Sequence, residues 1–278
     1  MNIRFNYDIC TGCGLCSRAC GSKRIEMGQD DKPYKIIELG CNDCGHCIAV
    51  CPVSAVENTR VDMSAFAEMS DPAISFEQFI HLVRNRRSIR NFKKEQLSKG
   101  HIDKLLEAVR YIPTGSNKQS LKYKFITDRN LLVKISKKMA CRMRRVSKLI
   151  NLFPVRYFVR EERRRSLKRL TDLFYKGNDT FLRGTPCLLV IYTEEKYFTI
   201  PKWDAGIASN TIDLAAQTLG IATLMNGYFV ILANRYKSIR DLAQISGKQT
   251  ILTAICLGYP EFRYKKTVFR RPPDVKII

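Results

Sequence analysis

The chain lacks several features that would place a protein quickly in a common class. Its 278 residues contain no apolar run of 18 residues, so no membrane-spanning helix is expected. There is no G-x-G-x-x-G after a strand-like segment, no G-x-x-x-x-G-K-[ST] and no H-E-x-x-H. The sequence therefore contains no motif for a separate dinucleotide domain, for phosphoryl transfer or for zinc-dependent hydrolysis. The first ten residues lack an apolar h-region, which predicts no signal peptide and a reducing, cytoplasmic setting.

Cysteine, by contrast, is plentiful and patterned. Eight of the 11 cysteines form two copies of C-x2-C-x2-C-x3-C, at residues 10–20 and 41–51, and every cysteine has its counterpart 31 residues later. A fixed offset of this kind indicates an internal repeat. Disulfides need an oxidising compartment, and zinc sites usually pair one CxxC with a distant second motif. The spacing therefore favours two [4Fe–4S] clusters over disulfides or zinc.

Residues 1–62 resemble the bacterial two-cluster ferredoxins, in which the fourth Cys of each copy ligates the other cluster. Gly12, Gly14 and Gly45 are expected in tight turns around inorganic sulfur. Gly21 stands where these ferredoxins usually have Pro, and His46 is expected to tune the second cluster. The resemblance implies one cluster on Cys10, Cys13, Cys16 and Cys51, and a second cluster on Cys41, Cys44, Cys47 and Cys20.

Charge divides the chain into two parts. Residues 1–70 carry 7 Lys and Arg against 9 Asp and Glu, whereas the remainder carries 41 against 17. The sign changes near "SDPAIS", whose turn residues suit a linker. We therefore predict a two-cluster domain over residues 1–70 and a second domain over residues 75–278.

The basic excess is greatest in residues 134–183, which hold 16 basic and 4 acidic residues on a helical apolar pattern. A nucleic-acid patch, an anionic membrane surface and a docking face for an acidic redox partner are the functional readings. A solvated lid or insertion without a specific partner is the alternative. No zinc-finger or RRM signature supports nucleic acid, which is therefore an unlikely partner.

The second part predicts an α+β fold with a central mixed sheet flanked by helices. Amphipathic helices are expected over 75–86 and 95–115, and a long helix with small residues over 204–223, with Asp204 as its N-cap. Residues 122–128 alternate like a strand, and the apolar runs 185–194 and 251–260 read as buried strands. Cys187 and Cys256 fall in those runs and are expected in the core, whereas Cys141 lies among cations.

Five short motifs occur in order along the second part. They are "RRSIRNF" at 86–92, "PTGSNKQS" at 113–120, "LGIATLMNG" at 219–227, "GYP" at 258–260 and "RRPP" at 270–273. The first is a compact anion site, because guanidinium forks and a hydroxyl match phosphate oxygens. Over residues 76–278 this order and spacing resemble the FMN-dependent nitroreductase family. The segment 134–183 is long for that family and is expected to form a lid over the substrate.

The resemblance implies an FMN site at the interface of a homodimer. Arg86, Ser88 and Arg90, with Arg87 nearby, are expected to contact the FMN phosphate and the pyrimidine side of the flavin. Asn226 and Gly227 are expected beside the flavin N5. Further contacts are implied for Ser116, Asn117 and Gln119 from the partner subunit, and for Arg270 and Arg271 at the phosphate.

Together the two parts predict an FMN-dependent oxidoreductase in which two [4Fe–4S] clusters relay electrons to or from the flavin. Small electrophiles such as nitroaromatics or quinones are the expected substrates, and NAD(P)H or reduced ferredoxin the expected donor. No side chain is predicted to catalyse the reaction, because the cofactor carries the chemistry. Low-potential clusters suggest the cytoplasm of an anaerobic bacterium or archaeon. The alternatives are a non-catalytic electron-transfer or redox-sensing protein and a nucleic-acid-binding redox regulator.

Overall fold

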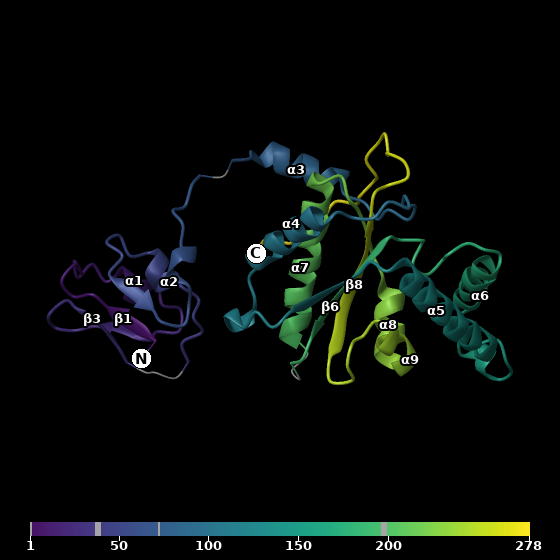
Figure 1. Ribbon diagram of the computed structural model, residues 1–278, viewed down its shortest axis with the longest axis horizontal. Coiled ribbons are helices and arrows are strands. Elements are labelled where there is room, and N and C mark those ends of the chain that lie inside the picture. The colour runs from purple at the N-terminus through teal and green to yellow at the C-terminus, as the bar shows by residue number, and fades with distance from the viewer. Residues whose placement is uncertain (1, 37–39, 72, 196–198) are drawn as a thin grey trace. The chain divides into compact units, whose positions relative to one another are not determined.

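A computed structural model of the chain describes residues 2–36, 40–71, 73–195 and 199–278. Its contacts divide the chain into two compact units (Figure 1). The N-terminal unit comprises Met1–Ala73 together with Ser116–Lys118, and the C-terminal unit comprises Ile74–Gly115 and Gln119–Ile278. Within the described ranges, no helix is long and apolar enough to cross a membrane.

The N-terminal unit is built from two short helices and two small antiparallel sheets around a core of Ile3, Ile25, Ile48 and Val56. One sheet pairs the first strand with the last, and the other is a hairpin between the two cysteine motifs. Each helix begins inside a cysteine motif. The elements are β1 (Ile3–Phe5), α1 (Leu15–Ala19), β2 (Ile25–Met27), β3 (Pro33–Lys35), α2 (His46–Ala49), β4 (Val56–Asn58) and the 3-10 turn η1 (Met63–Ala65).

The 31-residue repeat is preserved in the backbone. Gly14 and Gly45 occupy equivalent positions, and both are left-handed N-caps, with φ of 68° and 76°. The side-chain ring of Phe66 leaves no room at Gly45, where an added Cβ would lie 2.8 Å from a ring carbon. The turn after Cys20 also matches the turn after Cys51, since each Cys carbonyl accepts a hydrogen bond from the N–H three residues later. Gly21 therefore serves the same turn as Pro52.

The C-terminal unit is organised around a four-stranded sheet with the strand order β5-β6-β8-β7. Its strands are β5 (Lys122–Ile126), β6 (Cys187–Thr193), β7 (Ala222–Met225) and β8 (Thr250–Gly258), and all three pairings between them are antiparallel. The mixed character expected from the sequence is limited to an isolated parallel bridge between Ser88 and Thr223. That bridge attaches the arginine-rich motif to the edge of the sheet at β7.

Helices cover both faces of this sheet, which explains why β6 and β8 carry long apolar runs rather than alternating. On one face pack α4 (Lys99–Arg110) and α7 (Thr199–Thr218), and on the other pack α5 (Arg129–Leu149), α8 (Gly227–Arg235) and α9 (Lys237–Leu242) (Figure 1). Leu188 and Val190 face the second group, whereas Cys187 and Leu189 face the first. The remaining elements are α3 (Phe76–Asn85), α6 (Glu161–Tyr175) and the 3-10 turns η2 (Gly115–Asn117) and η3 (Val155–Tyr157).

The expected elements of this unit are present, with differences at their ends. The α+β class is confirmed, and Cys187 and Cys256 are fully buried. The prediction of Asp204 as an N-cap is wrong, because α7 begins at Thr199, five residues earlier than the motif suggested, with Pro201 in its first turn. The predicted packing face of α3 is also largely exposed, with Phe76 at 70% and Phe79 at 41%.

Candidate functional site

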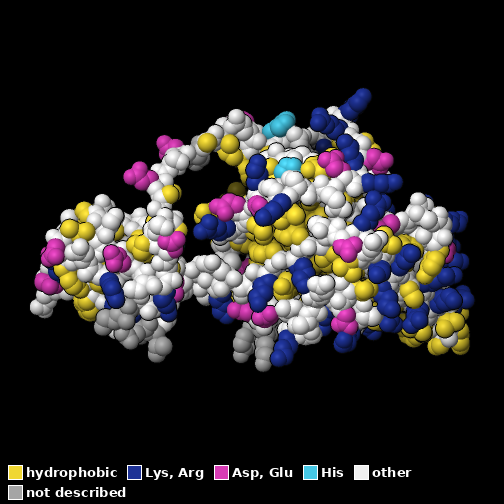
Figure 2. All heavy atoms as spheres, viewed as in Figure 1, with side chains coloured by type: hydrophobic (Ala, Val, Ile, Leu, Met, Phe, Trp, Pro, Cys, Tyr) yellow, Lys and Arg dark blue, Asp and Glu magenta, His cyan; other side chains and the backbone are white. Residues whose placement is uncertain are grey.

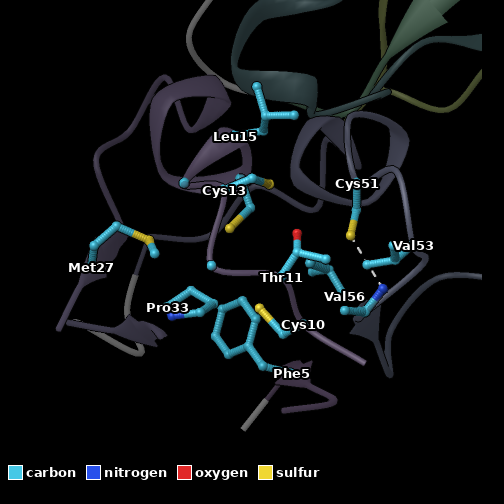
Figure 3. Close-up of a pocket in the computed structure, with 14 residues that line it drawn as sticks. Phe5, Cys10, Thr11, Cys13, Leu15, Met27, Pro33, Cys51, Val53 and Val56 are labelled. Atoms are coloured by element: carbon cyan, nitrogen blue, oxygen red, sulfur yellow. Dashed lines mark hydrogen bonds between the residues drawn. The ribbon is translucent and has the colours of Figure 1, made fainter. Parts of the chain in front are cut away.

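The first cysteine set surrounds a cavity in the N-terminal unit. Its lining includes Cys10, Cys13 and Cys16 from the first motif and Cys51 from the end of the second. In Figure 3 the labelled sulfur atoms of Cys10, Cys13 and Cys51 point toward the same space. The remaining wall is mostly apolar, with Phe5, Leu15, Met27, Pro33, Val53 and Val56 among its residues. This grouping is the crossed arrangement that the ferredoxin resemblance implied.

The second set is likewise assembled across the repeat. The pKa of the Cys47 thiol is raised to about 11. Burial is the largest cause, and the neighbouring thiols of Cys44, Cys41 and Cys20 add to it. Cys20 belongs to the first motif, so it lies near the three leading cysteines of the second. Such crowding opposes ionisation of free thiols, and iron would reverse it, because metal binding deprotonates thiols.

The residues of both sets fit iron–sulfur clusters. Four thiols line each location, and backbone N–H groups already point at sulfur: Arg24 donates to Cys20 Sγ and Ala55 to Cys51 Sγ, each at 3.2 Å. Hydrogen bonds of this kind tune cluster potentials. Within the described residues, no three His, Cys, Asp or Glu side chains are grouped as a single metal ion would need.

The charges around the two sets differ although their backbones match. Lys32 Nζ donates to the carbonyl oxygen of Cys10 at 2.9 Å and has no ion-pair partner within the described residues, so a cation adjoins the first set. Beside the second set, Arg60 donates to the carbonyl of Cys41 but is paired with Asp43 at 2.7 Å. Burial of the Asp43 carboxyl opposes ionisation, yet hydrogen bonds from Asn58 and Arg60 lower its pKa overall. The two locations therefore experience different net charge.

We expect the substitution Lys32→Gln to lower the reduction potential of the cluster held by the first set, because removing a nearby cation disfavours the more negative reduced state. A redox titration followed by electron paramagnetic resonance would measure both clusters separately. Lys35→Gln, on the next strand, removes the same charge without that contact and is the matched control. Equal shifts in the two variants would contradict a specific effect of Lys32.

The arginine-rich motif opens into a pocket of about 360 Å³ in the C-terminal unit, within the range of small-ligand sites. Arg86 and Arg87 line it, and Arg263 and Tyr264 complete the wall from the chain after β8. The guanidinium of Arg87 lies over the Tyr264 ring, 4.9 Å from its centroid. Its Nη1 is buried and has no hydrogen-bond partner among the described residues. Such an orphaned cationic donor fits an anionic group in the pocket.

Arg86 is held by a buried network. Its Nη1 pairs with Asp213 Oδ2 at 3.2 Å, and the Thr223 hydroxyl donates a short hydrogen bond to the other oxygen of Asp213. The Asp213 side chain is only 8% exposed. A carboxylate in this position fixes the direction of the Arg86 guanidinium, and Thr223 in turn adjoins Ser88 through the parallel bridge.

The turn at 113–120 is strained. Ser116, Asn117 and Gln119 all have left-handed backbones, with φ of 53°, 53° and 49°. Each such non-glycine residue costs on the order of 1–2 kcal/mol. The turn is anchored where the Gly115 N–H donates to the buried Asp204 carboxylate at 3.1 Å. Strain of this kind is common in ligand-binding turns.

The other predicted flavin residues occupy separate places. Ser88 is partly buried, and Arg90 is exposed, donating to the Ser88 carbonyl at 3.3 Å. Asn226 is buried as the N-cap of α8, where it accepts from the Phe229 N–H and donates to the Phe181 carbonyl. Gly227 is exposed in the first turn of α8, whereas Arg270 and Arg271 lie in the exposed C-terminal tail and do not line the pocket.

Sequence reasoning missed Asp213, Thr223, Arg263 and Tyr264 at this pocket. Asp213 and Thr223 both fell in the helix expected over 204–223, where they looked like ordinary members. Their connection to the motif runs through Arg86, which is distant in sequence, so no local pattern marks them. Arg263 could have been noticed as a cation three residues after the "GYP" turn.

Comparisons with known proteins agree with this division. The family described as "Nitroreductase family" matches residues 83–259, and "4Fe-4S dicluster domain" matches residues 2–52. A protein of Archaeoglobus fulgidus, provisionally described as an NADH dehydrogenase/NAD(P)H nitroreductase, is 24% identical over 189 residues, which is 66% of this chain and 87% of that protein. A ferredoxin of Pyrobaculum islandicum is 43% identical over 54 residues, 19% of this chain and half of that protein.

Solved structures show the same fold for the C-terminal unit. A nitroreductase with bound FMN from Bacteroides fragilis has a TM-score of 0.57 at 16% identity, covering 72% of this chain and 97% of its own. An FMN-dependent nitroreductase from Clostridium difficile has a TM-score of 0.54 at 23% identity, covering 73% of this chain and 100% of its own.

The fold and the family match define the class of protein: an FMN-dependent oxidoreductase preceded by a 4Fe–4S dicluster ferredoxin domain. The chain belongs to the nitroreductase family, whose match covers more than half of its length.

Proposed function

We propose that this protein takes up electrons singly at its N-terminal cysteine sets and delivers them in pairs to a small electrophile at its flavin site. FMN, when bound, supplies the exchange between one-electron and two-electron chemistry. The single observation that carries the proposal is that two complete four-cysteine sets share one chain with a nitroreductase fold. The experiment below tests this direction of electron flow, from the clusters toward the flavin.

The arginines bind and orient the flavin in this proposal. The orphaned Nη1 of Arg87 and the guanidinium of Arg86, fixed by Asp213, supply donors for the FMN phosphate. Arg90 and Ser88 contact the pyrimidine side, and their cationic surroundings favour a negatively charged reduced cofactor. The N–H of Gly227, in the first turn of α8, is the donor offered to N5, since helix N-terminal N–H groups lack intrahelical partners.

We propose further that the site is completed in a homodimer. Ser116, Asn117 and Gln119 then approach the flavin of the partner subunit, and Arg270 and Arg271 reach the phosphate from the C-terminal tail. The exposed apolar side chains of α3 support such a pairing, because Phe76 and Phe79 form part of an amphipathic face that the described chain leaves largely uncovered.

The substrates we propose are nitroaromatics, quinones or similar planar electrophiles, with NAD(P)H or reduced ferredoxin as the donor. The deciding experiment is anaerobic reduction of the purified holoprotein, separately with NADH, NADPH and reduced ferredoxin, while the flavin and cluster absorbances are followed. We expect ferredoxin to bleach the cluster bands first and the flavin band second, and turnover of a nitroaromatic or quinone to follow.

Two outcomes would oppose the proposal. A holoprotein that contains FMN but no cluster absorbance would remove the relay. Rapid reduction of the flavin by NAD(P)H, with the clusters following slowly, would make the flavin pocket the entry point and the N-terminal unit an exit path.

A further inference from the structure

Helices α5 and α6 form an antiparallel arm that ends in an exposed apolar tip. Helix α6 packs against α5, and residues 150–160 connect them. Five large apolar side chains of this tip are strongly exposed: Leu149 at 56%, Leu152 at 58%, Phe153 at 79%, Tyr157 at 70% and Phe158 at 86%. Figure 2 shows hydrophobic side chains gathered beside Lys and Arg side chains at the end of the α5–α6 arm, which Figure 1 labels.

Cations surround the tip on both helices. Residues 144–165 contain eight Lys and Arg against two Glu, and one of those glutamates, Glu161, already pairs with Arg165. The cations and the rings lie together, since the guanidinium of Arg156 is 5.3 Å from the centre of the Tyr157 ring. The basic side chains are Arg144, Arg145, Lys148, Arg156, Arg160, Arg163, Arg164 and Arg165.

We propose that the tip of the α5–α6 arm binds an anionic lipid surface. Aromatic and aliphatic side chains enter the boundary between headgroups and acyl chains, while Lys and Arg at the same depth meet the lipid phosphates. The charge of the segment is complementary to such a surface. A protein partner would need about 800 Å² of matched surface on each side, whereas five exposed apolar side chains on a projecting tip need only a fluid interface.

This placement is independent of the flavin pocket and of the cysteine sets, because it uses none of their residues. Binding of the tip to a lipid surface would also set where the reaction takes place, because it holds the enzyme where apolar electrophiles concentrate. The arm does not span the bilayer, because binding through side chains at the tip leaves both helices outside the acyl region.

Sedimentation of the holoprotein with vesicles tests the proposal. We expect binding to vesicles of phosphatidylcholine with phosphatidylglycerol, weaker binding at high salt, and little binding to phosphatidylcholine alone. The double variant Phe153→Ser and Phe158→Ser should bind the anionic vesicles about tenfold or more weakly, through lost apolar burial. Tyr111→Ser, which alters a similarly exposed aromatic residue at the end of α4, should bind like the parent.

A fluorescent reporter separates insertion from simple adsorption. Trp203 is the sole tryptophan of the chain and is 66% exposed, so Trp203→Phe combined with Phe158→Trp places one reporter at the tip. Its emission should shift to shorter wavelength with anionic vesicles, while FMN content and circular dichroism stay like the parent.

Three results would overturn the proposal. They are absence of binding to anionic vesicles at low salt, equal binding by the parent and the double serine variant, and an unshifted reporter in a protein that does sediment. Binding of duplex DNA that depends on Phe153 and Phe158 and displaces the vesicles would assign the tip to nucleic acid instead.

Discussion

The substitution Cys51→Ser is expected to remove the cluster assigned to Cys10, Cys13 and Cys16, although Cys51 belongs to the second motif. The physical reason is the cavity of Figure 3, which Cys51 shares with the first motif. Serine is a poor ligand for a cluster normally held by four thiolates. Iron and sulfide should therefore fall by about half, because one of two equal clusters is lost, and the spectrum of the reduced protein should lose one of its two components.

Paired substitutions make the crossed arrangement testable. Cys13→Ser combined with Cys51→Ser should retain about one cluster, since both residues serve the same one. Cys44→Ser combined with Cys51→Ser should retain almost none, since these two serve different clusters. The reverse pattern, with one cluster surviving in the Cys44 and Cys51 double variant, would mean that each motif holds its own cluster.

The substitution Arg90→Gln is expected to weaken FMN binding about 10- to 100-fold, the loss that follows from removing one charged hydrogen bond of about 1.5–3 kcal/mol. Arg90 is exposed and makes no described ion pair, so thermal stability should change little. Fluorescence titration of the protein without flavin would give the affinity for FMN, and thermal melting of the same samples would give stability. An unchanged affinity would exclude Arg90 from the flavin site.

Arg86→Gln should lower both quantities, and this contrast is the stronger test. It leaves the Asp213 carboxylate, 8% exposed, without its cation. Breaking a buried pair costs about 3–5 kcal/mol, and because 29% of the Arg86 side chain is exposed we expect the lower part of that range. The double variant Arg86→Gln with Asp213→Asn should regain most of the stability but not the FMN affinity, because the amide can still accept from Thr223 without carrying a charge.

If the double variant regained FMN affinity as well, Arg86 would act on the fold alone. Arg87 would then be the principal cation of the pocket, as its orphaned Nη1 already suggests.

Elements of the fold could be predicted from the sequence where the residues that mark them are close together in the chain. Helix α3 was predicted within a residue from its amphipathic pattern, and in the structure Ser75 and Gln78 form a capping box at its start. Helix α7 was misplaced at its beginning, because Asp204 resembles an N-cap in sequence. In the structure this carboxylate is inside the helix, where it accepts from the Gly115 N–H.

The eight cysteine ligands, their repeat and the family of the second unit could be predicted from the amino-acid sequence alone. Ligand spacing is a local property, and a fixed offset of 31 residues survives in the backbone, where Gly14 and Gly45 adopt the same left-handed geometry. The order of the five motifs was equally visible along the chain, and the match to residues 83–259 confirms the family that they indicated.

Which side chains contact one another could be seen only in the folded structure. It joined Asp213 of α7 to Arg86 and to Thr223 of β7, and it set Tyr264 against Arg87. It also showed that residues 149–158, in the middle of the basic segment, expose their apolar side chains rather than burying them, which the helical periodicity could not foretell. Arg86 and Asp213, like Arg87 and Tyr264, lie more than a hundred positions apart in the sequence. Such pairing depends on how the sheet and helices pack, and no local pattern encodes that packing.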